Sequence, residues 1–94
     1  MNHARNIHTT GTVTSITYPA YGGSAQLDVM ISPLGEEMYS GGADSLLLRF
    51  LGRRTMACLE IGSLVRVRGT LSRSQGVPVV FNPAITVMAG DENV

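Results

Sequence analysis

The chain has 94 residues, of which 44% are hydrophobic, and this length and apolar content predict one domain with a single core. Its seven arginines and seven acidic residues give a formal net charge of zero, which argues against a protein that coats nucleic acid over its whole surface. The single cysteine, Cys58, allows neither an internal disulfide nor a zinc site, and we expect it to be a small buried apolar residue.

The N-terminal segment MNHARNIHTTG lacks the apolar centre of a secretory signal, and no run approaches the roughly 18 apolar residues of a membrane span. We therefore expect a cytoplasmic protein with no membrane partner. We expect the folded core to cover about residues 7–88, between a flexible N-terminus that holds His3 and His8 and a polar C-terminal tail, AGDENV.

Strand patterns dominate the chain, beginning with a predicted hairpin. GTVTSITY (11–18) is rich in β-branched residues and is followed by a proline and the turn-forming AYGGS. AQLDVMIS (25–32) alternates, with Leu27, Val29 and Ile31 on one face. PLGEEMYSGGAD (33–44) contains one proline, three glycines and three acids, which predicts a long exposed loop.

The middle of the chain has two further elements. SLLLRFL (45–51) is apolar on both faces except at Arg49, which predicts a central strand with neighbours on both sides. RRTMACLEIG (53–62) places Met56 and Leu59 at helical spacing before a glycine, so we expect a short helix or one irregular turn.

Two more strands are predicted after this segment. SLVRVRGTL (63–71) alternates, so its side chains divide between two faces. The division is Val65, Val67 and Gly69 against Arg66, Arg68 and Thr70. VPVVFNPAITVM (77–88) is a last strand interrupted by Pro83.

Five strands with an insertion of about ten residues between the third and fourth give the element order of the OB-fold, a small Greek-key barrel. Its second and third strands and flanking loops bind oligonucleotides or oligosaccharides. We therefore expect an all-β, five-stranded OB-fold Greek-key barrel with a short helix between strands three and four, as one domain over residues 1–94. Glycines 11, 52, 62 and 69 fit the sharp bends of a small barrel. A six-stranded or SH3-like barrel has similar strand statistics and stays an alternative.

Three segments give the chain a family resemblance: FLGRR (50–54), LEIGSLVRVRGTL (59–71) and GVPVVFNPAITV (76–87). They resemble short OB-fold nucleic-acid-binding-domain proteins of high-GC Gram-positive bacteria. A looser likeness extends to the wedge OB domain of bacterial fork-remodelling helicases and to OB domains of the anticodon-binding type. The likeness covers roughly residues 10–88, and its most specific part combines Leu51-Gly52-Arg53-Arg54 with Phe81-Asn82-Pro83. It implies the fold and an expectation of nucleic-acid binding.

Positive charge is concentrated in the second half of the chain. Residues 45–88 hold six arginines and one acid, Glu60, whereas residues 26–44 hold four acids and no base. Guanidinium groups suit bidentate phosphate contact and stacking on planar groups. The predicted phosphate-binding residues are Arg49, Arg53, Arg54, Arg66, Arg68 and Arg73.

The spacing of Arg66 and Arg68 places both on one strand face, with their guanidinium groups about 7 Å apart, close to the phosphate spacing of a single strand. The alternative is a solvated face with ion pairs to Glu60 or Asp28. Arg53 and Arg54 follow a strand end, where a helix N-terminus would add to phosphate binding, or they belong to a polar loop that caps the barrel.

Single-strand binding normally pairs such arginines with aromatic platforms on which bases stack. Tyr18, Tyr21 and Tyr39 lie at or in predicted loops and are the candidates for this role, the alternative being that they pack over the barrel mouth. Phe50 and Phe81 are expected in the core.

No pattern predicts an enzyme. The two histidines have no spaced carboxylate or cysteine partner, so no metal site or triad is expected, and no phosphate-cradling glycine motif is present. The four acids between residues 26 and 44 are Asp28, Glu36, Glu37 and Asp44. They lie in or beside one predicted loop and are expected to be solvated. We expect no cofactor.

The sequence therefore predicts a non-enzymatic module that binds single-stranded nucleic acid, DNA or RNA, through an arginine-lined face with little sequence specificity. The alternative is a protein-interaction or structural module that self-associates or pairs with a replication, repair or translation protein through an apolar strand face such as that of Leu47 and Leu51. Oligosaccharide binding is disfavoured because the chain has no tryptophan to stack on sugars.

Overall fold

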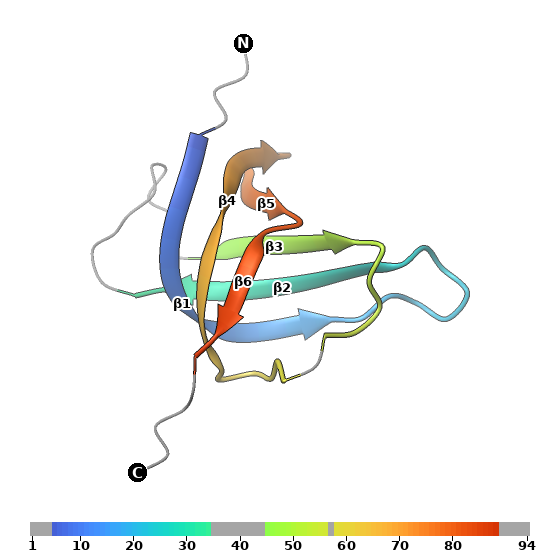
Figure 1. Cartoon of the computed structure of the whole chain (residues 1–94). Helices are drawn as coiled ribbons and strands as arrows, with labels where there is room; N and C mark the ends of the chain where they lie inside the picture. Colours follow the sequence, from blue (N-terminus) through green and yellow to red (C-terminus); the bar gives the residue numbers. More distant parts are fainter. Residues whose placement is uncertain (1–4, 35–44, 57, 89–94) are drawn as a thin grey trace.

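The computed structural model describes residues 5–34, 45–56 and 58–88 (Figure 1). Within these ranges the chain is all-β and forms six strands. They are β1 (Arg5–Thr17), β2 (Gln26–Pro33), β3 (Leu46–Leu51), β4 (Leu64–Ser74), β5 (Val77–Phe81) and β6 (Ala84–Val87). No helix in the described part of the chain is long and apolar enough to cross a membrane.

Five of the strands close into a ring in the order β1-β2-β3-β5-β4, and a β1–β4 pairing completes it. The pairs are antiparallel except for β3 and β5, which are parallel. β1 closes the ring because it is long: residues 5–12 pair with β4 and residues 11–17 with β2, with a register shift between Val13 and Ser15 that marks a bulge. In Figure 1 the curved blue strand makes this change of partner.

The core lies inside the ring and follows the predicted alternation. Leu27, Val29 and Ile31 of β2 are fully buried, and Val65 and Val67 of β4 belong to the same buried cluster. β3 lies between β2 and β5, which confirms the expected central strand. Burial of each such side chain contributes about 1.5–3 kcal/mol to the stability of the fold. The outward-facing side chains are not part of this core, so they are available for other roles.

Gly11 lies where β1 passes from β4 to β2. A Cβ atom at this position would lie 2.8 Å from the backbone oxygen of Ser32 and 3.1 Å from Cδ1 of Ile31. No side chain fits this close approach of two strands, so glycine is required here for space.

The last predicted strand is interrupted at Pro83, as expected, and forms β5 and β6. β5 pairs with residues 71–74 of β4, and β6 pairs with residues 65–68. At the kink between them Asn82 has a φ of 49°, its amide donates to the Arg49 carbonyl at 2.8 Å, and its Oδ1 accepts from the Leu51 amide at 2.8 Å. β3 therefore stays attached to β5, while β6 pairs with β4 alone among the described strands.

The expected helix over 53–62 is absent from the described residues of that segment. Cys58 has a φ of 66°, which the right-handed helix excludes. Leu59 is buried and Met56 packs against the core without helical backbone. Two backbone hydrogen bonds hold the segment against β1. The Gly62 amide donates to the Val13 carbonyl at 2.8 Å, and the Val13 amide donates to the Ser63 carbonyl at 2.9 Å. Met56 and Leu59 thus contact the core from an irregular connection, although their spacing is that of a helix.

Three further expectations are corrected. Cys58 is exposed, because the irregular connection turns it away from the core. The first strand begins at Arg5, six residues earlier than GTVTSITY, so His8 belongs to the sheet and not to a flexible terminus. Most of the predicted loop over 33–44, together with Tyr39, lies outside the described residues, as do His3 and the C-terminal tail.

Candidate nucleic-acid interface

Arg66 and Arg68 lie together on the outer face of β4. Because strand side chains alternate, these two arginines are exposed while Val65 and Val67 are buried inside the ring. This confirms the predicted division of the strand.

Neighbouring strands extend this face on both sides. Arg68 lies opposite His8 of β1 and Ala84 of β6, and Arg66 lies opposite Thr10 of β1 and Thr86 of β6. In antiparallel pairs directly opposite side chains have Cβ atoms about 4.5–5.5 Å apart, so the groups of the three strands are neighbours.

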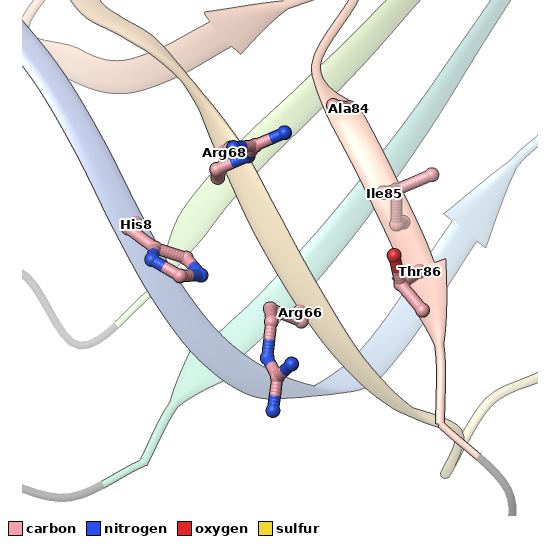
Figure 2. A pocket seen from close by; sticks show the side chains of 6 residues that line it. All are labelled: His8, Arg66, Arg68, Ala84, Ile85 and Thr86. Carbon is pink, nitrogen blue, oxygen red and sulfur yellow. The ribbon is translucent and has the colours of Figure 1, made fainter.

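These side chains surround a hollow of about 310 Å³, which we call the basic hollow (Figure 2). It is lined by His8, Arg66, Arg68, Ala84, Ile85 and Thr86. Figure 2 shows the imidazole on β1, the two guanidinium groups on β4 and the threonine hydroxyl on β6. All four groups can donate hydrogen bonds to an anion, and no acidic residue of the described part of the chain lines the hollow.

Both arginines keep their donors free within the described residues. Neither Arg66 nor Arg68 has a hydrogen bond or an ion pair there, so the expected ion pairs to Glu60 or Asp28 are absent from the described structure, while the solvated face of that alternative is present. Two exposed guanidinium groups on one face repel each other weakly, and an anion between them relieves this repulsion.

Arg49 lies on the outer face of β3 and, unlike Arg66 and Arg68, it forms an ion pair. Its Nε lies 3.0 Å from Oδ1 of Asp28 and its Nη2 lies 3.2 Å from Oδ2, and these two residues are directly opposite in the β2–β3 pair. The hydrogen bonds to Asp28 raise the pKa of Arg49, against the opposing effect of partial burial. Arg49 is therefore charged and already paired, which explains how an apolar strand accommodates it.

Arg53 and Arg54 lie in the β3–β4 connection and are exposed. The Nη2 of Arg54 donates to the Gly23 carbonyl in the β1–β2 loop, and the Gly52 amide donates to the Ala25 carbonyl at 2.9 Å. These bonds tie the connection to the loop. Because no helix is present in the described residues here, the expected contribution of a helix N-terminus is lost.

The β1–β2 loop carries the two described tyrosines. Tyr18 is 56% exposed and Tyr21 is fully exposed, so neither packs over the ring. Arg54 contacts this same loop at Gly23, which groups one arginine with the tyrosines at an end of the sheet. No contact joins this group to the basic hollow in the described structure.

Arg73 lies at the far end of β4, next to the two-residue β4–β5 turn. Gln75 and Gly76 have φ values of 55° and 83°, the pattern of a type I′ turn. The Nη1 of Arg73 donates to the Gly76 carbonyl at 3.4 Å. The predicted arginines therefore do not share one face: Arg66 and Arg68 are brought together on β4 with free donors, and Arg53, also without a hydrogen bond among the described residues, lies in the β3–β4 connection.

The sequence prediction misplaced two residues, His8 at the basic hollow and Phe81 beside Arg49. His8 was assigned to a flexible terminus, although the alternation of Ile7, Thr9 and Gly11 inward with His8 outward continues the first strand and was a usable signal. Phe81 was assigned to the core, yet it is 43% exposed, and the Arg49 guanidinium carbon lies 6.0 Å from its ring centroid. The run VPVVF hides its outward position, because three consecutive residues of β5 are buried.

Comparisons with protein-family models, with curated proteins and with solved structures found no match.

Proposed function

We propose that the protein is a non-enzymatic OB-fold module that binds single-stranded nucleic acid, DNA or RNA, with little sequence specificity, and that it does so in the cytoplasm. The strand order supports the fold assignment. β1, β2 and β3 follow one another and β4 returns beside β1, which is the spatial order 4-1-2-3 of a Greek key. The insertion of β5 between β3 and β4 closes the five strands, as in an OB barrel.

The observation that carries the functional proposal is the basic hollow. Arg66 and Arg68 lie two residues apart on one strand face, about 7 Å along the strand, and both have free donors within the described residues. This spacing suits two successive phosphates of a single strand. His8 and Thr86 supply further donors from the neighbouring strands.

The phosphate contacts of this proposal lie away from the surface that OB-folds most often use. That surface is the outer face of strands two and three, where Asp28 neutralises Arg49 in this chain. A phosphate at that face would have to compete with the carboxylate for the guanidinium. β4 is therefore favoured over β3 as the phosphate-binding strand.

The exposed loop tyrosines extend the proposal to bases. Tyr18 and Tyr21 are exposed in the β1–β2 loop, and Arg54 contacts this loop. Base stacking on an aromatic ring contributes about 1–3 kcal/mol per base and tolerates any sequence. A strand long enough to reach the loop gains affinity without gaining specificity.

Titration of a labelled single-stranded decamer at two salt concentrations tests the proposal. Two phosphate contacts give a slope of log K against log salt of about −1.4, since each contributes about −0.7 on a single strand. Raising salt from about 50 to 200 mM then weakens binding about sevenfold. Absence of binding at low salt, or binding indifferent to salt, contradicts the proposal.

A second candidate function, self-association, is favoured by an exposed apolar pair. Leu51 is 50% exposed and Phe81 is 43% exposed, at the adjoining ends of β3 and β5. Light scattering over a range of concentrations tests this candidate. A mass of two copies that returns to one copy in Phe81→Ser supports it, and a mass of one copy at every concentration rules it out.

A further inference from the structure

A second hollow adjoins the basic hollow at the start of β6. It has a volume of about 510 Å³, and we call it the apolar hollow. It is lined by Phe50, Arg53, Met56, Asn82, Pro83, Ala84 and Ile85. The basic hollow is also lined by Ala84 and Ile85, so these two residues of β6 form part of the wall of both hollows. Both volumes fall in the range of roughly 300–1,000 Å³ that is usual for small-molecule sites.

The kink between β5 and β6 creates the apolar hollow. β3 pairs with β5, whereas β6 pairs with β4 alone among the described strands, so beyond Asn82 the chain leaves β3 and follows β4. Phe50 and Pro83 form buried walls, and Met56 contributes a half-buried wall from the β3–β4 connection. No described helix covers this end of the ring, where a short helix was expected.

Two polar groups line the apolar hollow. The Oδ1 of Asn82 already accepts the Leu51 amide at 2.8 Å, so its side-chain amide nitrogen is left to donate. Arg53 has no hydrogen bond or ion pair within the described residues. The hollow thus combines apolar walls with donors, which suits a flat apolar ring that carries acceptors on its edge.

From this juxtaposition we propose that one nucleotide of the bound strand occupies both hollows, with its phosphate against Arg68, the next phosphate of the strand against Arg66, and its base in the apolar hollow. Arg68 lies directly opposite Ala84 in the β4–β6 pair. At this boundary the side chain is therefore a single methyl group, which leaves room for a ligand to pass from one hollow to the other. A nucleobase has the ring and the edge acceptors that the apolar hollow fits, and its own phosphate supplies the adjacent anion.

This inference rests on the proposed function and makes it more specific. A base that enters the apolar hollow must be unpaired and unstacked, which gives the protein a physical reason to prefer single strands over duplexes. Phosphate contacts alone give no such preference.

Two labelled decamers with the same number of phosphates test the inference: a thymidine decamer and a decamer of abasic residues. The wild-type protein is expected to bind the thymidine decamer more tightly, by about tenfold for the base in the apolar hollow and further for bases that stack on Tyr18 and Tyr21. The Ala84→Leu variant fills the boundary and is expected to lower this preference about tenfold. Val77→Leu, which enlarges an exposed side chain of β5 outside both hollows, is expected to keep the wild-type preference.

A measurement on the unaltered protein makes the test independent of any variant. The methyl resonance of Met56 is expected to shift on addition of the thymidine decamer and to stay unchanged with the abasic decamer. Equal affinity of the wild type for the two decamers, an unchanged preference in Ala84→Leu, or an unmoved Met56 methyl overturns the inference and leaves the phosphate contacts of the proposed function standing. Failure to bind either decamer at low salt overturns the proposed function itself.

Discussion

Replacement of Gly11 by alanine tests how closely β1 and β2 approach at the bend of the ring. The added Cβ would lie 2.8 Å from the Ser32 carbonyl oxygen, and an ordinary contact needs at least 3.4 Å, so the strands must separate by about 0.6 Å. The oxygen belongs to a paired strand and cannot rotate away as a side chain would. Overpacking of this kind costs about 1–3 kcal/mol, and the stiffer unfolded chain of alanine offsets about 0.4–1 kcal/mol.

The net expectation is a loss of about 1–2 kcal/mol in the free energy of unfolding, or a fall in Tm of about 5–15 °C for a chain of this size. Chemical and thermal denaturation followed by circular dichroism measure it. Gly23→Ala is the matched control, because it makes the same change in an exposed loop where the nearest atom to the added Cβ is 3.3 Å away. If Gly11→Ala is as stable as Gly23→Ala, the close approach of the strands is refuted.

Three other changes are predicted to alter stability, and denaturant unfolding measures each. Thr9 is 5% exposed and its Oγ1 has no hydrogen-bond partner in the described structure, so Thr9→Val is expected to stabilise by about 1 kcal/mol; a loss of stability would show that the hydroxyl is bonded. A double-mutant cycle of Asp28→Asn and Arg49→Met is expected to give a coupling energy of about 1 kcal/mol, and additive effects would show that the ion pair contributes nothing. Gln75→Asn is expected to stabilise by about 0.5 kcal/mol, since asparagine adopts the left-handed conformation of this turn more easily; a lower unfolding midpoint would contradict the turn type.

Much of the fold follows from alternation in the sequence. The buried face of AQLDVMIS, the central position of SLLLRFL and the break at Pro83 depend on period-two patterns and on the missing amide of proline, which are local properties. Of the two alternatives over 53–62, the short helix was wrong and the irregular turn agrees with the described residues, because Met56 and Leu59 reach the core from irregular backbone that Val13 holds in place. The conformation of that segment therefore depends on its contacts with β1 in the folded protein.

The site was also predictable only in part, because alternation along one strand is a local property and the pairing of distant strands is not. That Arg66 and Arg68 share a face follows from their spacing. That Asp28 neutralises Arg49 depends on the register of β2 against β3, and that His8 adjoins Arg68 depends on the register of β1 against β4. Registers between distant strands are tertiary properties, and so the sequence did not separate the paired arginine from the free ones.

The central claim is that Arg66 and Arg68 hold phosphates, and the salt dependence of decamer binding tests it most directly. The double variant Arg66→Gln, Arg68→Gln is expected to reduce the slope of log K against log salt by about 1.4, because two phosphate contacts are lost. Arg73→Gln removes one positive charge from the far end of the same strand and is the control, with a slope expected to match the wild type. A double variant that keeps the wild-type slope would contradict the assignment of the basic hollow as the phosphate site.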